Sequence, residues 1–189
     1  MRLFVGLAVP PALRDALSLM RGGLEGARWV APSDYHLTLR FLGEVAPPDA
    51  RALQDALADL AGYPFDLEIA GFGAFGDGGP GSLHLGVRPS DPLRRLRSSV
   101  DEAVRAAGLG PPDARRYSPH VTLARFGFRG GKGVAAWMGG RAVPDAPFTA
   151  DRVTLYSARP RGGGPYHAVE TYPLGPDWSQ EDEDEDDWA

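Results

Sequence analysis

Two short motifs in this sequence have the residue types and the spacing of an acid–base site. HLTL at residues 36–39 is matched by HVTL at residues 120–123, in a chain with four histidines and five threonines. Two such motifs would arise by chance in well under about one sequence in a hundred. Residues two apart in a strand point to the same face, so each motif would present an imidazole beside a hydroxyl.

An imidazole titrates near pH 6.5, so around neutrality one of two histidines can be neutral while the other is protonated. The neutral ring of one, His36 or His120, could take a proton from a nucleophile while the other gives one to a leaving oxygen. Each transfer contributes about 10²–10⁴ in rate. The hydroxyls of Thr38 and Thr122 could hold the non-bridging oxygens of a phosphodiester, where negative charge develops. This chemistry requires neither a metal nor an organic cofactor.

Periodic patterns of apolar residues predict strands and helices in alternation. A period of two predicts strands, and apolar residues at i, i+3 and i+4 predict helices. The expected strands cover residues 2–9, 28–30, 33–43, 65–75, 82–88, 117–126, 152–158 and 166–172. The expected helices cover residues 11–24, 49–60, 91–109 and 134–138. This mixture indicates an α+β fold.

The order of these elements occurs twice, and the sequence repeats with it. LFVGL near the amino terminus resembles LHLGV at an offset of 80, which pairs Phe4 with His84. The two histidine–threonine motifs are related by an offset of 84. Such a repeat predicts two similar lobes, from halves at about 1–80 and 81–175, whose equivalent motifs meet at a central cleft.

Composition limits the classes of protein to which the chain can belong. Apolar residues at 43% and charged residues at 24% of 189 are ordinary for a globular protein, and this length can bury a core. The absence of cysteine excludes disulfides, thiolate zinc sites and cysteine catalysis. No apolar run reaches the roughly 20 residues that span a bilayer, and no secretory leader is evident. We therefore expect a cytoplasmic protein without membrane contact.

The charge of the chain is divided between a slightly basic body and an acidic tail. Residues 181–187 are all acidic and carry −7, whereas the other 20 basic and 18 acidic residues leave +2. We expect residues 1–178 to form a single bilobal domain and residues 179–189 to be a disordered, solvating tail. A second hypothesis is that this tail competes electrostatically with substrate phosphates for the cleft.

At the two motifs the chain resembles a known family. HLTLRFLGE at residues 36–44 and SPHVTLARF at residues 118–126 resemble the two signature motifs of the 2H phosphoesterase superfamily. Within it, MRLFVGLAVP, RWVAPSDYHLTLRFLGEV and SLHLGV resemble the RNA 2′,3′-cyclic phosphodiesterases, formerly named bacterial 2′-5′ RNA ligases. The resemblance extends from Met1 to about Leu174, and the two motifs together make it specific.

The resemblance implies a bilobal α+β fold, each lobe an antiparallel sheet with helices, around a central cleft. It also implies metal-independent hydrolysis of RNA 2′,3′-cyclic phosphate ends to 2′-phosphates. By similarity His36 is the proton donor to the leaving 3′ oxygen and His120 the proton acceptor that activates water. Thr38 and Thr122 match the phosphate-holding hydroxyls. The residues alone do not distinguish acid from base. The expected partner is RNA with such ends, including halves of tRNA, and the expected state is a monomer.

Three further residues are candidates for binding the substrate. Arg40 lies an even number of residues after His36 and Thr38, so a regular strand would point all three side chains into the cleft. Arg125 lies an odd number of residues after His120, so a regular strand would point it away from the cleft. It reaches the cleft only if the strand ends or bulges after Leu123. The alternative for both is a solvated surface arginine. We expect His84 to line the cleft, where a flat ring could stack on a nucleobase, without taking part in proton transfer.

Other functions remain compatible with the same residues. The reverse reaction would join a cyclic phosphate to a hydroxyl end as a 2′-5′ ligase, and the superfamily also suggests cyclic nucleotides or ADP-ribose derivatives as substrates. A module that binds RNA ends without turnover is less compatible, because binding alone needs no matched acid and base. A metal hydrolase that uses both histidines as ligands is disfavoured, because no H-x-H or H-E-x-x-H pattern accompanies them.

Overall fold

The computed structural model describes residues 1–76, 81–111, 116–127, 131–159 and 164–175, so the acidic tail at 179–189 lies outside the described residues. The strands are β1 (Arg2–Ala8), β2 (Ala27–Trp29), β3 (His36–Glu44), β4 (Phe65–Asp66), β5 (Ile69–Phe75), β6 (Ser82–Val87), β7 (His120–Phe126), β8 (Thr149–Ala150), β9 (Arg152–Ala158) and β10 (His167–Pro173). The helices are α1 (Pro11–Leu19), the 3₁₀ helix η1 (Pro32–Asp34), α2 (Pro47–Ala58), α3 (Asp91–Ala106) and α4 (Val134–Gly139).

Most of the strands form one antiparallel sheet. Its order is β10-β9-β1-β3-β7-β6-β5, with β2 paired to β7, and β4 pairs separately with β8. The recorded pairings are all antiparallel, and helices alternate with strands along the chain, which confirms the α+β prediction.

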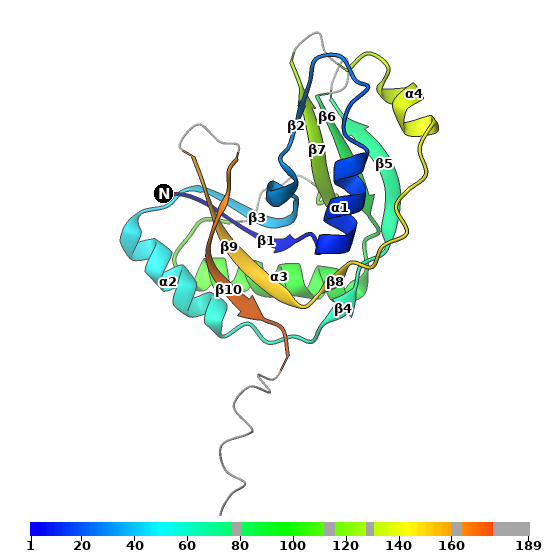
Figure 1. Cartoon of the computed structure of the whole chain (residues 1–189). Helices are drawn as coiled ribbons and strands as arrows, with labels where there is room; N and C mark the ends of the chain where they lie inside the picture. Colours follow the sequence, from blue (N-terminus) through cyan, green and yellow to red (C-terminus); the bar gives the residue numbers. More distant parts are fainter. Residues whose placement is uncertain (77–80, 112–115, 128–130, 160–163, 176–189) are drawn as a thin grey trace, which may run out of the picture.

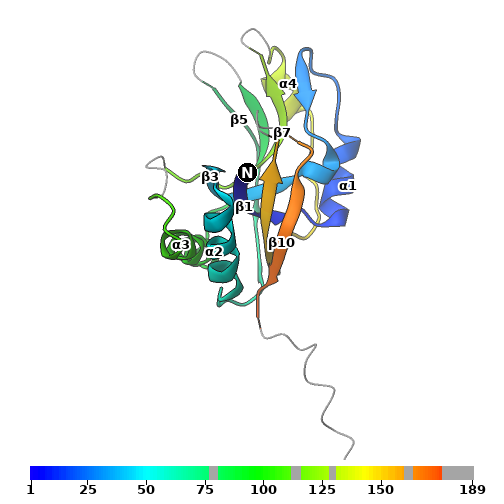
Figure 2. The same cartoon turned by 90° about the vertical axis from the view of Figure 1, so that its left-hand side faces the viewer.

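The sheet divides into two lobes that meet between β3 and β7. One lobe contains β10, β9, β1 and β3 with α2 and α3, and the other contains β7, β6, β5 and β2 with α4 (Figures 1 and 2). The lobes do not follow the repeat halves 1–80 and 81–175, which corrects that part of the prediction. β5 from the first half pairs with β6 from the second, and β9 from the second half pairs with β1 from the first. Each half therefore contributes strands to both lobes.

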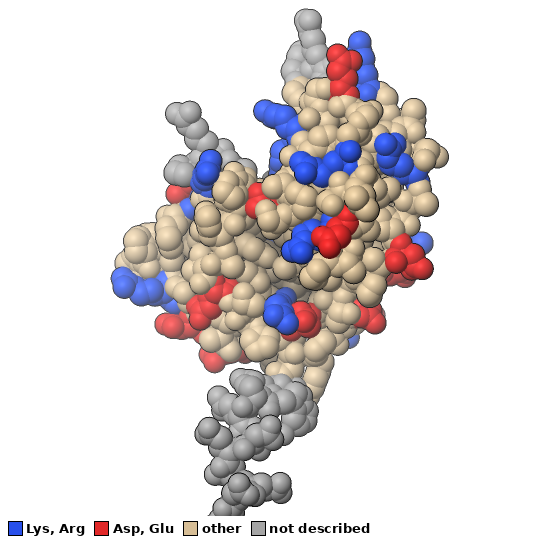
Figure 3. Space-filling model, in the orientation of Figure 1, with Lys and Arg blue, Asp and Glu red and all other residues tan. Residues whose placement is uncertain are grey.

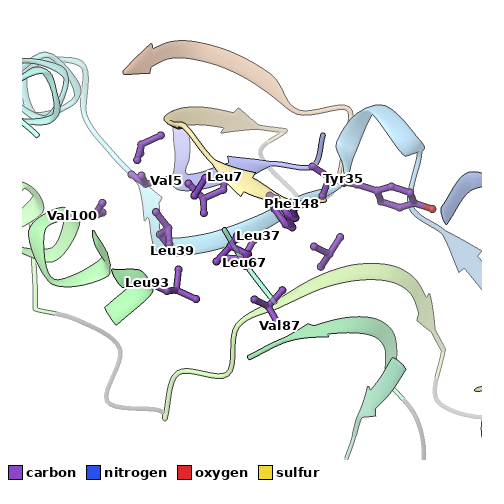
Figure 4. Packing of buried hydrophobic residues seen from close by; sticks show 14 of the residues in the cluster. Val5, Leu7, Tyr35, Leu37, Leu39, Leu67, Val87, Leu93, Val100 and Phe148 are labelled. Carbon is purple, nitrogen blue, oxygen red and sulfur yellow. The ribbon is translucent and has the colours of Figure 1, made fainter. Parts of the chain in front are cut away.

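The buried apolar residues form one core that both lobes share. Figure 4 shows its central part, where side chains of the strands meet α3 and the segments beside β4 and β8. The labelled members are Val5, Leu7, Tyr35, Leu37, Leu39, Leu67, Val87, Leu93, Val100 and Phe148. Leu37 and Val121, where the lobes meet, are both 0% exposed. The junction between the lobes is therefore part of the core and is not a solvent-filled hinge.

The longest helix, α3, follows its sequence pattern closely. Leu93, Leu96, Val100 and Val104, spaced three or four apart, are buried as the periodicity predicts. The side chain of Ser90 accepts a hydrogen bond from the backbone N–H of Leu93 at 3.4 Å, which caps the first turn. Among the described helices, α3 included, none is long and apolar enough to cross a membrane.

Candidate active site

The two histidine–threonine motifs lie on adjacent strands. β3 pairs with β7 through Leu37 and Val121, whose side chains face the core. The residues on either side of this pair therefore point to the opposite face of the sheet. In an antiparallel register centred on it, His36 lies across from Thr122, and Thr38 lies across from His120. The two motifs are thus related by an approximate twofold axis, and Figure 3 shows the surface hollowed between the lobes.

Both imidazoles are held in the same way. Nδ1 of His36 lies 2.7 Å from the carbonyl oxygen of Asp34, and Nδ1 of His120 lies 2.7 Å from that of Ser118. A carbonyl can only accept, so in each ring Nδ1–H donates, and Nε2 has no hydrogen-bond partner among the described residues. Each Nε2 can therefore accept a proton when its ring is neutral, or donate one when it is charged.

His36 lies among aromatic rings that come from distant parts of the chain. Its ring centroid is 4.6 Å from that of Phe4, 5.0 Å from Tyr166 and 5.7 Å from Tyr156. Burial lowers the pKa of His36, and the positive charges of Arg125 and His120 lower it further. The carbonyl and the carboxylate of Asp34 oppose this decrease in pKa. In the free protein the ring is therefore predominantly neutral at pH 7.

Asp34 is a buried carboxylate that anchors this aromatic surround. Its side chain is 7% exposed, and Oδ1 accepts the backbone N–H of Tyr166 at 3.1 Å. A Cβ atom at Gly164 would lie 1.8 Å from Oδ2 of Asp34, so the backbone there can approach the carboxylate only as glycine. The ring of Tyr166 is thereby held edge-on to His36, with an interplanar angle of 89°.

His120 lies beside a different pair of rings. Its centroid is 4.9 Å from that of Phe75 and 5.2 Å from that of His84, and Phe75 stacks on His84 at 4.0 Å. His84 is 8% exposed, whereas Phe75 is 40% exposed. Burial, followed by the charge of His120, lowers the pKa of His84 to about 4. His84 is therefore a neutral ring packed beneath Phe75, and Phe75 presents the larger aromatic surface to solvent.

A β-bulge changes the direction of the side chains in β3. Thr38 pairs with Gly6 and Arg40 pairs with Val5, so Leu39 is the extra residue. Side chains therefore alternate between the two faces of the sheet as far as Leu39, and Arg40 points to the same face as Leu39 rather than to the opposite one.

The bulge turns Arg40 away from the motif face. Arg40 is 7% exposed and forms an ion pair with Asp101 of α3 at 3.5 Å. Its guanidinium also donates to the carbonyl oxygens of Gly110 and Pro111. The prediction that Arg40 points into the cleft is wrong, because it assumed a regular strand.

A second bulge occurs at the equivalent position of β7. Thr122 pairs with His84 and Ala124 pairs with Leu83, which leaves Leu123 as the extra residue. The bulge after Leu123 that Arg125 needs in order to reach the cleft is therefore present. Arg125 is exposed, and its charge lowers the pKa of His36, so it lies within electrostatic reach of the first motif.

Sequence reasoning missed several of the residues that surround the two imidazoles. Phe75, Tyr156 and Tyr166 lie outside the segments that carry the family resemblance, and Asp34, which lies inside one of them, was not singled out. The pairing of Phe4 with His84 at an offset of 80 was the one sequence signal that rings would flank both histidines. Within the described ranges, no three His, Asp or Glu side chains are grouped as a metal site requires.

Comparison with known proteins places the sequence in a family. The family model described as the 2′-5′ RNA ligase superfamily matches residues 9–161. A Geobacillus stearothermophilus protein named RNA 2′,3′-cyclic phosphodiesterase is 30% identical over 188 residues, covering 90% of this chain and 56% of that relative. A Bacillus subtilis (strain 168) protein of the same name is 31% identical over 163 residues, covering 82% of this chain and 83% of the relative. The chain thus spans little more than half the length of the Geobacillus relative.

Solved structures share the fold. E. coli LigT complexed with 3′-AMP superposes with a TM-score of 0.70 at 24% identity, covering 93% of this chain and 98% of that one. TT0787 of Thermus thermophilus gives a TM-score of 0.67 at 27% identity, covering 92% and 98%. The bilobal fold that the resemblance implied is therefore confirmed. With the family model matching 153 residues of the sequence, counted from residue 9 to residue 161, this chain belongs to the 2′-5′ RNA ligase superfamily.

Proposed function

We propose that this protein hydrolyses 2′,3′-cyclic phosphate ends of RNA to 2′-phosphates, without a metal, by acid–base catalysis with two histidines. The observation that carries the proposal is the matched placement of His36 and His120 on paired strands, each with Nδ1 bonded to a carbonyl and Nε2 free. The names of the Geobacillus and Bacillus relatives, RNA 2′,3′-cyclic phosphodiesterase, support the same reaction.

The reaction needs one proton removed and one supplied. Nε2 of neutral His120 takes a proton from water as the water oxygen bonds to phosphorus. The bond from phosphorus to the 3′ oxygen breaks, and that oxygen takes the proton from Nε2 of charged His36. One water molecule is added, the products are a 2′-phosphate and a 3′-hydroxyl, and proton exchange with solvent restores both rings.

The anionic substrate itself prepares the proton donor. Burial lowers the pKa of His36, which leaves the ring mainly neutral in the free enzyme. A phosphate anion beside the ring favours the charged form and raises its pKa, so substrate binding and protonation of His36 support each other. The assignment of His36 as donor rests on the family resemblance and on this linkage.

The remaining polar groups on the motif face bind the phosphate. Thr38 and Thr122 follow the histidines at the strand spacing that points hydroxyls to the same side, and Arg125 supplies a positive charge. The guanidinium can bond two phosphate oxygens at once. His84 contributes indirectly, because it supports Phe75, whose exposed ring can stack on a nucleobase.

The proposed substrate is a cleaved RNA that carries a cyclic phosphate, such as a tRNA half. We propose that the enzyme acts on this RNA as a monomer and in the cytoplasm. Lys and Arg side chains lie on both sides of the hollow between the lobes (Figure 3), as binding of a polyanion requires.

A second candidate function is 2′-5′ ligation by the same site. If the 5′-hydroxyl of another RNA replaces water, the same two proton transfers join the ends. The exposed ring of Phe75 lies beside His120, the proposed acceptor, where the nucleotide carrying that hydroxyl could stack. This exposed ring is the observation that favours ligation as the second candidate.

The test is a product analysis with purified protein and a short RNA ending in a 2′,3′-cyclic phosphate, in the presence of EDTA. We expect a 2′-phosphate product, identified by chromatography against authentic 2′- and 3′-phosphate standards. A 3′-phosphate product, or tight binding without product, would contradict the proposed hydrolysis. Loss of activity in EDTA would contradict a metal-independent reaction.

A further inference from the structure

The two motif strands are joined by less backbone pairing than their neighbours. Within the described strands β3 pairs with β7 at Leu37 and Val121 alone, whereas β3 pairs with β1 from His36 to Glu44. The two proposed catalytic histidines lie on either side of this short seam. Backbone hydrogen bonds alone therefore constrain their relative position weakly, and side chains that cross the seam become important.

Tyr117 makes one such crossing. It lies three residues before His120, and its hydroxyl donates to the backbone carbonyl oxygen of Thr38 at 3.0 Å. Burial raises the pKa of Tyr117, so the phenol stays protonated and remains a donor across the working pH range. The guanidinium of Arg97 lies 4.2 Å from the centre of its ring and holds the ring against α3.

Arg40 ties β3 to α3 and to the residues that follow this helix. Beyond the bulge its side chain points away from the motif face, and its guanidinium donates to the carbonyl oxygens of Gly110 and Pro111. Asp101 holds the guanidinium at 3.5 Å and also lies 4.0 Å from Arg97. Arg40 and Tyr117 are thus linked through one cluster of side chains.

We propose that Tyr117 and Arg40 are positioning residues that fix the spacing of His36 and His120 across the β3–β7 seam. This inference rests on the proposed function, because it assigns the purpose of the spacing to proton transfer. The bulge turns Arg40 away from the motif face, and Tyr117 reaches the first motif through a backbone carbonyl. A displacement of about 1 Å in a catalytic geometry can cost on the order of 100-fold in rate, so even a small opening of the seam is measurable.

The direct test compares Tyr117→Phe with the matched control Tyr35→Phe. Tyr35 precedes His36 and is 3% exposed, but its hydroxyl has no hydrogen-bond partner among the described residues, so removing it breaks no bond. We expect Tyr117→Phe to lower kcat by about 10- to 100-fold with KM changed less than about twofold. Tyr35→Phe should change both by less than about twofold. An unchanged kcat in Tyr117→Phe would overturn the proposal.

A double-mutant comparison separates positioning from general stability. In a His120→Gln background there is no second imidazole to place, so adding Tyr117→Phe should lower the residual rate by less than about twofold. If Tyr117→Phe costs the same factor in both backgrounds, the residue does not act through the spacing of the histidines.

Arg40 is tested with a variant that keeps its charge. Arg40→Met would remove the positive charge that lies 3.5 Å from Asp101 and endanger folding. Arg40→Lys keeps a positive charge, but its single nitrogen cannot replace both Nη1, which faces Asp101, and Nη2, which donates to the two carbonyls. We expect kcat to fall by about tenfold in Arg40→Lys, with KM within about twofold of wild type. A rise in KM with unchanged kcat would overturn its role in positioning.

A measurement without substrate keeps this proposal separate from the proposed function. Hydrogen exchange of peptides covering residues 36–44 and 117–126 should be faster in Tyr117→Phe than in wild type, and unchanged in Tyr35→Phe. Equal exchange in all three proteins would show that the hydroxyl does not hold the seam. If wild type fails to hydrolyse the cyclic phosphate, the proposed function fails, while the exchange data still decide whether Tyr117 closes the seam.

Discussion

The two motif strands share a frame but differ in their surroundings. In both β3 and β7 the histidine bonds the carbonyl two residues before it, and a bulge follows the threonine at the next leucine. After the bulge, Phe41 and Arg125 occupy equivalent positions and are both exposed, so one strand presents a ring where the other presents a cation. The backbone geometry that the two strands share sets where the imidazoles lie, and the side chains that differ between the strands set the electrostatic environment of each imidazole.

The residues before the histidines differ as well. Asp34 is a buried carboxylate near His36, whereas its equivalent, Ser118, has no charge. His36 is enclosed by rings of β1, of β9 and of Tyr166, which directly precedes β10, and His120 packs on His84 of the neighbouring strand. The two histidines therefore share a backbone geometry but not an environment, and on the first strand burial lowers the pKa of His36.

The largest expected effect comes from removing either histidine. His36→Gln and His120→Gln should each lower kcat/KM by about 10²–10⁴-fold, and His167→Gln, at an exposed position of β10, should leave it unchanged. In pH profiles His36→Gln should lose the fall at high pH, and His120→Gln should lose the fall at low pH. Because burial lowers the pKa of His36, the titration left in kcat/KM of His120→Gln should lie below pH 6.5.

If instead His36→Gln lost the fall of kcat/KM at low pH and His120→Gln lost the fall at high pH, the acid and base roles of the two histidines would be exchanged. Both limbs surviving in both variants would mean that neither histidine is the acid or the base.

A smaller effect should appear in stability at low pH. The pKa of His84 is lowered to about 4 in the folded protein and lies near 6.5 in the unfolded chain. The unfolded state therefore binds more protons, and stability falls as pH decreases from 6.5 towards 4. Between pH 7 and pH 4.5 the free energy of unfolding should decrease in both proteins. The decrease should be smaller in His84→Phe than in wild type by roughly 2 to 3 kcal/mol, measured by urea unfolding. Equal losses in the two proteins would show that burial does not disfavour the charged ring.

The smallest effect concerns the cation that distinguishes the second strand from the first. Arg125→Gln should lower kcat/KM by about tenfold, through lost phosphate bonding, and should raise the pKa of His36 because a nearby positive charge is removed. Arg51→Gln, on an exposed position of α2, is the matched control. An equal loss in both variants would show that the overall charge of the protein matters and that the position of Arg125 does not.

The sequence determined the two motifs, the fold class, most elements and the inward direction of Leu37 and Leu39, because period-two and helical patterns record which side chains are buried. Tertiary structure decided the direction of Arg40, since the extra residue Leu39 in β3 reverses the side chains that directly follow it and no local pattern marks where it is inserted. It also decided that Tyr156 and Tyr166 surround His36, and that strands are exchanged between lobes. Those contacts join residues more than a hundred positions apart, and they depend on how the sheet closes rather than on any neighbouring sequence.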